Sequence, residues 1–398
     1  MKQSFYYNGT ILTMEGHSPH YVESVLVEDG VILAAAEQNL LERELKKNAR
    51  MVNLQGKAML PGLIDVNARP AAAVCRALER DASRQEKTVG LLKFVRMLGE
   101  SISRYTACGI TTLQEVLCGE KEFQLLKLAG MFGRLPVDVA CCFRLEASKQ
   151  NLPVQNPALN LHRMHLRRAG CIASEEIFAD REDLKEWMRL CVQNRWQLTV
   201  PVRDETEIAC FLDCYEEILT EDEELDNTLP RPVLTNVRGI YRDQLKRCRE
   251  LGVMTEYGIE RLRRLGDKSF AEVYGPEQTE RICPLRSAVW TGLPIVIYPE
   301  EAQRVHMLSC VHQAVNRTTD GGHILGMQER LSPYEALRAV TIHAACRLFE
   351  EEHKGSIRAG KDADFVILDQ DPLQAAPEKI DTVKVLETIK RDQSVFRL

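Results

Sequence analysis

The two ends of the chain carry the period-two pattern of short β-strands. Near the N-terminus, turn pairs such as Asn8-Gly9 and Asp29-Gly30 separate strands expected at residues 6–14, 24–28, 31–35 and 51–54. The pattern returns after Gly355, with strands expected at residues 363–368 and 383–387. We therefore expect both ends to combine into one small β-sandwich domain formed by residues 1–57 and 355–398.

Between these ends, short apolar runs alternate with amphipathic helical segments. The apolar runs lie at residues 62–66, 109–113, 137–142, 198–202, 233–237 and 295–298. Helices are expected at residues 183–193, 205–219, 242–251 and 303–315. Buried strands that alternate with helices indicate a parallel sheet, and this many repeats favours a closed barrel over an open sheet. The expected fold class is α/β, with a distorted (β/α)8 barrel over residues 58–354.

Length, composition and charge agree with this division and exclude some partners. A chain of 398 residues suits one barrel of roughly 250 residues plus an accessory domain. The hydrophobic content of 44% and charged content of 28% are ordinary for a globular protein. The formal charge is −6 and basic residues are interleaved with acidic ones, which argues against nucleic acid as a partner.

The N-terminal sequence and the cysteines both indicate a cytoplasmic protein. The first residues have no long apolar region or cleavage site, so no signal peptide is expected. No stretch reaches the ~18 apolar residues of a membrane span, and no membrane partner is expected. The 13 cysteines lie mostly inside apolar runs. They are expected to be buried free thiols in a reducing compartment.

Four stretches, taken in order, resemble one known family. They are NGTILTM with VEDGVILA, then GKAMLPGLIDVNAR, then PLRSAVWTGLPIVIYPEEA with AVNR, and finally LSPYEALRAVTIHAACRLFEEEHKGSIRAGKDADFVILDQDPL. Together they resemble the amidohydrolase superfamily, in particular the branch with a composite β-sandwich beside the barrel. Generic turns between strands would explain each stretch alone, but not all four in this order. A fold does not supply a function, so the site has to be examined separately.

The resemblance implies one or two divalent metals at the carboxyl-terminal mouth of the barrel. Strand one of such proteins offers two histidines at alternate positions, strands five and six one each, and strand eight an aspartate that serves as ligand and base. Strand four often gives a carboxylated lysine or a glutamate, and His165 is a candidate for that position. At the other positions this chain has Asn67, Arg69, Pro201, Asn236 and Glu300.

These substitutions remove every imidazole that the resemblance leads one to expect at the mapped positions. Arg69 has no lone pair for a cation, Pro201 offers no side-chain ligand, and an asparagine amide is a weak ligand that suits hard ions. The sequence also lacks an HExxH motif and a Cys–His cluster. We therefore expect no metal and no other cofactor, with zinc only if a hydrolase site persists in another form.

Two roles are open for the substituted mouth. Arg69 and Glu300 could form an ion pair that holds the strands together as a metal would. Alternatively, the mouth could bind a small anionic ligand through Arg69, Asn67, Asn236, Arg203, Arg238 and Glu115. Arg203, Arg238 and Glu115 could equally be solvated charges beyond the strand ends.

Three functions are consistent with these residues. The first is an amidohydrolase-like protein that is non-catalytic, or strongly altered in activity, and binds a small molecule at the barrel mouth. The second is a hydrolase of carbon–nitrogen bonds other than peptide bonds, with Glu300 as the general base. The third is a structural partner that forms a homo-oligomer or assembles with an active paralogue.

Overall fold

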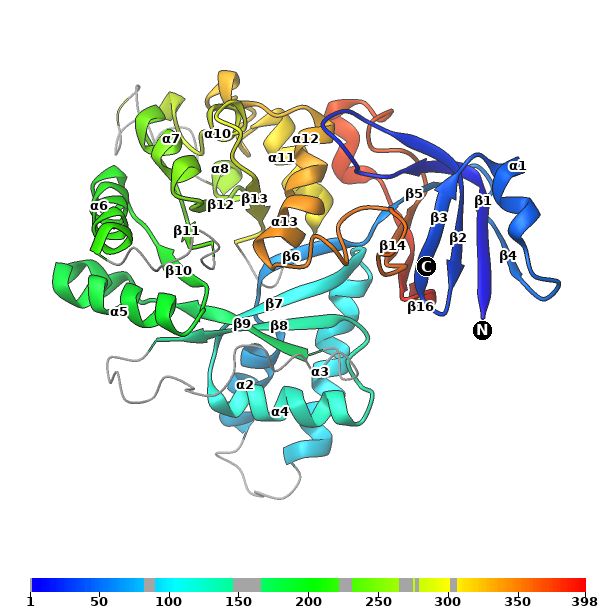
Figure 1. Ribbon diagram of the computed structural model, residues 1–398, viewed down its shortest axis with the longest axis horizontal. Helices are drawn as coiled ribbons and strands as arrows, with labels where there is room; N and C mark the ends of the chain where they lie inside the picture. Colours follow the sequence, from blue (N-terminus) through cyan, green and yellow to red (C-terminus); the bar gives the residue numbers. More distant parts are fainter. Residues whose placement is uncertain are drawn as a thin grey trace.

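The protein consists of a barrel and a second β-domain that contains both ends of the chain. The computed structural model describes residues 2–81, 90–145, 166–221, 231–264, 275, 279–300 and 306–398. Figure 1 shows the strands from both ends of the chain gathered at one end of the molecule, and the barrel at the other. The expected fold class, a (β/α)8-like barrel with a composite β-sandwich domain from both termini, is confirmed.

The terminal domain is built on one mixed sheet of eight strands. The N-terminal part contributes β1 (Gln3–Leu12), β2 (Tyr21–Glu28), β3 (Val31–Ala36), β4 (Arg50–Asn53) and β5 (Ala58–Pro61). The C-terminal part contributes β14 (Phe365–Leu368), β15 (Val385–Lys390) and β16 (Gln393–Arg397). The two parts are joined where β5 pairs with β14 in antiparallel register, opposing Met59 to Ile367. The division at residues 57 and 355 stays a prediction, and strand pairing places β5 with the terminal sheet.

The barrel is an eight-stranded parallel sheet in sequential order. Its strands are β6 (Leu63–Ala68), β7 (Ile110–Cys118), β8 (Asp138–Arg144), β9 (Leu166–Ile172), β10 (Leu198–Pro201), β11 (Val233–Thr235), β12 (Met254–Gly258) and β13 (Ile295–Tyr298). Two of them, β9 and β12, were not expected from the apolar pattern. Charged residues interrupt both, namely Arg167 and Arg168 in β9 and Glu256 in β12.

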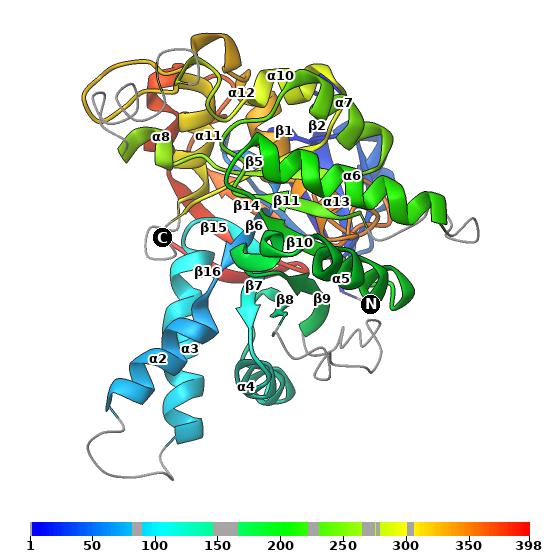
Figure 2. The same ribbon diagram turned by 90° about the vertical axis from the view of Figure 1, so that its left-hand side faces the viewer.

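Helices on the outside connect the barrel strands. They are α2 (Pro70–Asp81), α3 (Gly90–Thr106), α4 (Glu120–Met131), α5 (Arg181–Gln193), α6 (Glu205–Glu221), α7 (Arg242–Glu250), α8 (Arg261–Arg264), α10 (Leu285–Trp290) and α11 (Met307–Asn316). The four helices expected from the sequence correspond to α5, α6, α7 and α11. Figure 2 shows α2 and α3 lying side by side and projecting away from the strands.

The last two helices, α12 (Pro333–Ala339) and α13 (Ile342–Arg347), close one end of the barrel. Ser332 begins α12 with a capping box, since its hydroxyl accepts from the Glu335 amide while Glu335 accepts from the Ser332 amide. Helix α13 and the residue after it form one buried cluster with side chains from the first halves of the strands: Ala344, Ala345, Leu348, Ile64, Val233, Met254 and Val296. Because α13 fills the amino ends of the strands, the space inside the barrel opens at their carboxyl ends.

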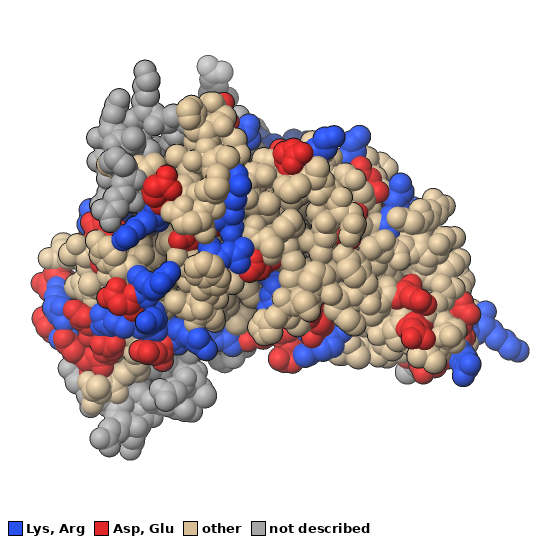
Figure 3. Space-filling model, turned by 90° about the horizontal axis from the view of Figure 1, so that it is seen from above, with Lys and Arg blue, Asp and Glu red and all other residues tan. Residues whose placement is uncertain are grey.

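Thiols and surface charge follow the sequence-based expectations in part. All 13 cysteines are free, as predicted; ten are buried, whereas Cys108, Cys210 and Cys346 are partly exposed. Basic and acidic side chains lie intermixed on the face shown in Figure 3, without an extended area of one sign among the described residues. In the described part of the chain, no helix has the length and apolar character needed to cross a membrane.

Candidate functional site

A cavity of about 520 Å³ lies at the carboxyl ends of the barrel strands. It brings together residues from β6 to β13 and from the segments just beyond them. Five of the residues singled out from the sequence line it: Asn67, Arg69, Pro201, Asn236 and Glu300. The positions carried over from the family resemblance therefore lie around one cavity, and the roles of these residues stay predictions.

Three other candidates, Arg203, Arg238 and Glu115, are not among the described residues that line the cavity. Arg203 is tied to the first turn of α6, where its Nε donates to Glu207 Oε1 at 2.6 Å. Arg238 follows β11, and its backbone carbonyl accepts from the Cys283 amide at 2.7 Å. Neither residue contributes to the cavity wall, so their assignment as ligand contacts is not supported by geometry.

Glu115 on β7 is buried and has a different role from the one expected. Its two carboxylate oxygens accept from the amides of Ala71 and Ala72, each at 2.9 Å, at the start of α2. A carboxylate at a helix N-terminus satisfies amides that have no partner within the helix. Burial nevertheless raises the pKa of Glu115 to about 7, against the lowering effect of the two amides. Glu115 thus fixes α2 behind the mouth.

The expected ion pair between Arg69 and Glu300 is not formed. Glu300 Oε1 lies instead 2.8 Å from Nε of Arg261, the first residue of α8. Gly258 makes room for this arrangement, because a Cβ there would lie 2.6 Å from Glu300 Cγ. The hypothesis named this carboxylate with the wrong guanidinium, because β12, which precedes α8 and pairs with β13, was not expected from the sequence.

Arg69 faces the cavity in an electrostatically unfavourable setting. Burial lowers the pKa of its guanidinium, and the neighbouring cations Arg76 and Arg144 lower it further, partly offset by Glu115. Among the described residues, no carboxylate forms an ion pair with Arg69. A partly buried guanidinium in such surroundings is suited to an anion that enters from solvent.

A second ion pair lies at the base of the cavity and was missed at the sequence level. Arg347, the last residue of α13, donates from Nε to Glu256 Oε1 at 2.5 Å and from its terminal nitrogens to Gln197 Oε1 at 2.6 Å and Thr199 Oγ1 at 3.0 Å. The side chains of Arg347 and Glu256 are 1% and 3% exposed. A glutamate within a buried strand was the available signal, but β12 was not recognised as a strand.

The residues at this mouth do not fit the imidazole-rich metal centre that the resemblance implies. The carboxylates that line the cavity, Glu256 and Glu300, are both engaged by guanidiniums. The remaining side-chain oxygen donors include the amides of Asn67 and Asn236, and neither histidine nor cysteine occurs among the described lining residues. Zinc prefers nitrogen and sulfur ligands in a tetrahedral arrangement.

The remaining histidine candidates do not alter this donor set. His165 lies outside the described residues. At the end of β9, the fourth strand of the barrel, the residues that line the cavity are Ile172, Ala173 and Ser174. His306 caps α11 by accepting from the Ser309 amide at 3.0 Å. His343 is partly buried on α13, with Nδ1 3.2 Å from the Ile295 carbonyl oxygen. Burial lowers the pKa of His343 to about 3, so its imidazole is neutral.

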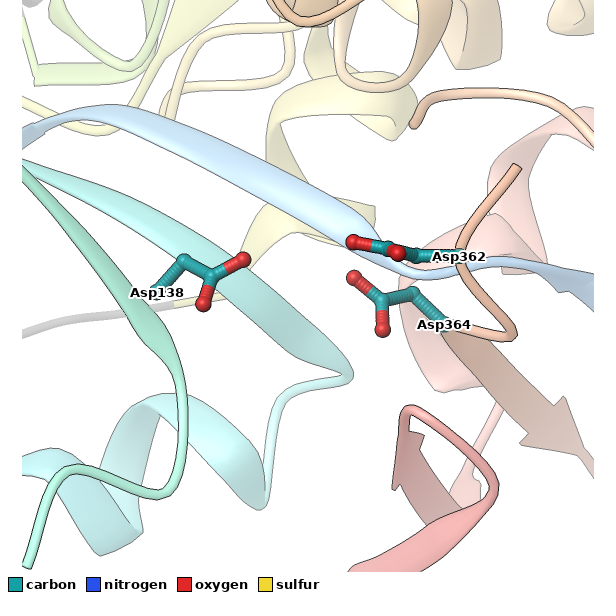
Figure 4. Close-up of side chains that lie close together, drawn as sticks. All are labelled: Asp138, Asp362 and Asp364. Atoms are coloured by element: carbon teal, nitrogen blue, oxygen red, sulfur yellow. The ribbon is translucent and has the colours of Figure 1, made fainter. Parts of the chain in front are cut away.

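Three aspartates come close together at the opposite end of the barrel. Asp138 at the start of β8 faces Asp362 and Asp364 just before β14 (Figure 4), with one oxygen of each within 4.8 Å of the others. Lys390 Nζ lies 2.6 Å from Asp138 and 2.5 Å from Asp364, and Arg391 pairs with Asp362 at 3.3 Å. These cations make the cluster an ion-pair network that joins the barrel to the terminal sheet.

Comparisons with known proteins agree with this architecture. The sequence model of the "Amidohydrolase family" matches residues 71–396. An N-substituted formamide deformylase of Arthrobacter pascens is 30% identical over 109 residues, which span 27% of this chain and only 20% of that protein. An imidazolonepropionase of Alkaliphilus oremlandii is 22% identical over 390 residues, covering 88% of this chain and 86% of that protein.

Solved structures of low sequence identity share the fold. An uncharacterized metal-dependent hydrolase of Pyrococcus furiosus superposes with a TM-score of 0.73 at 14% identity, covering 94% of this chain and 100% of that chain. An adenosine deaminase of Xanthomonas campestris with bound zinc gives a TM-score of 0.67 at 14% identity, covering 99% and 92% of the two chains.

Proposed function

Because this chain belongs to the amidohydrolase family, we propose that it uses the family's barrel to bind a small anionic ligand at the mouth, without a divalent metal. The observation that carries this proposal is the position of Arg69. Its guanidinium faces the cavity at the end of β6, where the resemblance leads one to expect a histidine. A fixed positive charge at that place repels a cation and attracts an anion.

The surroundings of the two acidic residues support the same proposal. Glu300 is paired with Arg261 and Glu256 with Arg347. Each of the two carboxylates therefore pairs with a guanidinium in place of a metal ion. Neither carboxylate adds uncompensated negative charge to the mouth. The cavity carries a net positive charge for a ligand to neutralise.

Metal analysis and anion binding test the proposal together. Protein purified without chelators is expected to contain far less than one equivalent of zinc, iron or manganese after dialysis. Titration calorimetry with acetate, phenylacetate and inorganic phosphate is expected to detect binding of at least one anion. Arg69→Gln should weaken that binding about tenfold or more, since a hydrogen bond to a charged group contributes roughly 1.5–3 kcal/mol.

Arg203→Gln is the matched control, because Arg203 has the same charge but pairs with Glu207 outside the cavity. It should bind the same anion as tightly as the unaltered protein. One equivalent of tightly held metal, or equal binding by the Arg69→Gln and Arg203→Gln variants, would contradict the proposal.

Hydrolysis of a carbon–nitrogen bond is the second candidate. The names of two relatives, a formamide deformylase and an imidazolonepropionase, favour it. Glu300, which pairs with Arg261, is then the candidate general base. Turnover of N-substituted formamides or imidazolonepropionate that Glu300→Gln abolishes, with added zinc or without it, would establish this alternative.

A further inference from the structure

Charge within the mouth is uneven and concentrated on one side. Four guanidiniums line the cavity, those of Arg69, Arg144, Arg261 and Arg347, against the carboxylates of Glu256 and Glu300. Arg261 and Arg347 are taken up by these two acids. The two other guanidiniums, on the side of β6 and β8, have no ion-pair partner among the described residues.

Arg69 and Arg144 lie at the carboxyl ends of the two strands that flank β7. Arg69 directly follows β6, and Arg144 is the last residue of β8. The carboxyl ends of parallel strands meet at one edge of the barrel, and Arg144 is close enough to lower the pKa of Arg69. The acid on the intervening strand, Glu115, is directed to the α2 amides rather than to either guanidinium.

The wall beside this pair of arginines is apolar. Val66, Val116, Leu117 and Ile172 line the cavity on strands β6, β7 and β9. Leu117 has a left-handed backbone with φ of +56°, which a leucine rarely adopts. Such a conformation persists only where the surrounding structure holds it, and it occurs preferentially at functional sites. Here it belongs to a residue that lines the cavity.

From these observations we infer that the mouth binds a small carboxylic acid with an apolar body, whose carboxylate lies between Arg69 and Arg144 and whose body rests on the wall that includes Leu117. This inference rests on the proposed anion binding and adds the ligand class and a second recognition residue, Arg144. Two guanidiniums match the planar, bidentate geometry of a carboxylate. A cavity of about 520 Å³ has room for an aromatic acid, whereas a bare inorganic anion would leave most of it unfilled.

Calorimetric titration with a graded set of ligands tests the ligand class. Phenylacetate is expected to bind more tightly than acetate, since burial of the ring adds apolar contact area. Phenylacetamide, which has the same shape without the charge, is expected to bind at least about tenfold more weakly than phenylacetate. Equal affinity for acetate and phenylacetate, tighter binding of inorganic phosphate, or no binding of any carboxylate would overturn the inference.

Substitutions at the two arginines separate this inference from the proposed function. Arg144→Gln is expected to weaken phenylacetate binding about tenfold or more. The control variant Arg203→Gln is expected to bind phenylacetate as tightly as the unaltered protein. Arg144 is exposed, so its substitution should leave the unfolding transition unchanged, which circular dichroism can verify. Loss of binding in Arg69→Gln but not in Arg144→Gln would refute the two-arginine site and keep the proposed function.

Leu117→Asn tests the apolar wall separately. Asparagine tolerates the left-handed backbone better than leucine does, so folding should be preserved. Affinity for phenylacetate should fall in this variant while affinity for acetate stays the same. A parallel loss for both acids, or for neither, would remove the apolar wall from the inference.

Discussion

Arg347 and Glu256 form an ion pair inside the barrel, with Nε of the arginine 2.5 Å from Oε1 of the glutamate. The pair links α13, which fills the amino end of the barrel, to β12, and further hydrogen bonds link it to β10. A guanidinium therefore ties neighbouring strands together at the base of the mouth. The sequence had suggested such a tie, but between Arg69 and Glu300.

Breaking this pair from one side should destabilise the protein strongly. Arg347→Met leaves the Glu256 carboxylate buried without its cation, which should lower the free energy of unfolding by about 3–5 kcal/mol. Urea unfolding measures the change. Arg397→Met is the control, because Arg397 is 73% exposed and its pair with Glu387 should contribute less than about 1 kcal/mol.

If both variants lost equally little stability, the buried pair would have no special role. The double variant Arg347→Met/Glu256→Met should be more stable than Arg347→Met alone, because it removes the unpaired charge.

Asp65 on β6 should make stability depend on pH. Burial raises its pKa from 3.8 to about 7, against the amide of Asn67, which donates to Oδ1 at 2.9 Å. Between these two values the folded protein binds more protons than the unfolded chain, so the contribution of Asp65 to stability falls as pH rises from about 4 to 7. Asp65→Asn should remove this loss and be more stable than the unaltered protein at pH 8, by on the order of 1–3 kcal/mol.

Urea unfolding of both proteins at pH 5 and pH 8 checks this expectation. The measured quantity is the difference in free energy of unfolding between the two proteins at each pH. The pH dependence of either protein alone would not suffice, because the lowered pKa of the partly buried His343 makes stability rise with pH. A difference that does not grow from pH 5 to pH 8 would show that Asp65 has no such linkage.

Gly258→Ala should disturb the mouth without adding or removing charge. The new Cβ would lie 2.6 Å from Glu300 Cγ, so the Glu300 side chain would have to move away from Arg261. Overpacking of this kind costs about 1–3 kcal/mol. Gly99→Ala is a suitable control, since Gly99 lies in α3 with open space around it and should gain up to about 1 kcal/mol. Equal thermal stability of the two variants would contradict the close approach at Gly258.

The three aspartates at the far end of the barrel should not respond to metal ions. Lys390 lies between Asp138 and Asp364, and although burial opposes its charge, these carboxylates raise the pKa of its ammonium. Calcium or magnesium should therefore leave the melting temperature unchanged, whereas Lys390→Met should lower it, because Asp364 loses its cation and Asp138 keeps Lys354 alone of its two lysine partners. A rise in melting temperature with either ion in the unaltered protein would indicate a metal site.

The sequence by itself determined the class of fold and the composition of the mouth. Strand and helix periods and four ordered motifs were enough to predict a barrel with a domain from both termini. Mapping the family's site positions onto this sequence was enough to select Asn67, Arg69, Pro201, Asn236 and Glu300, which line one cavity. This worked because strand periodicity and parallel order fix which residues reach the same edge of a barrel.

Only the tertiary structure decided how these charges are paired. Arg347 reaches Glu256 from 91 residues away in the sequence, and Arg261 pairs with Glu300 because α8 follows β12, the strand paired with β13. Glu115 likewise turned away from the mouth to cap α2. Pairing depends on distances of a few ångströms between side chains from separate elements, and those distances are set by packing, not by local sequence pattern.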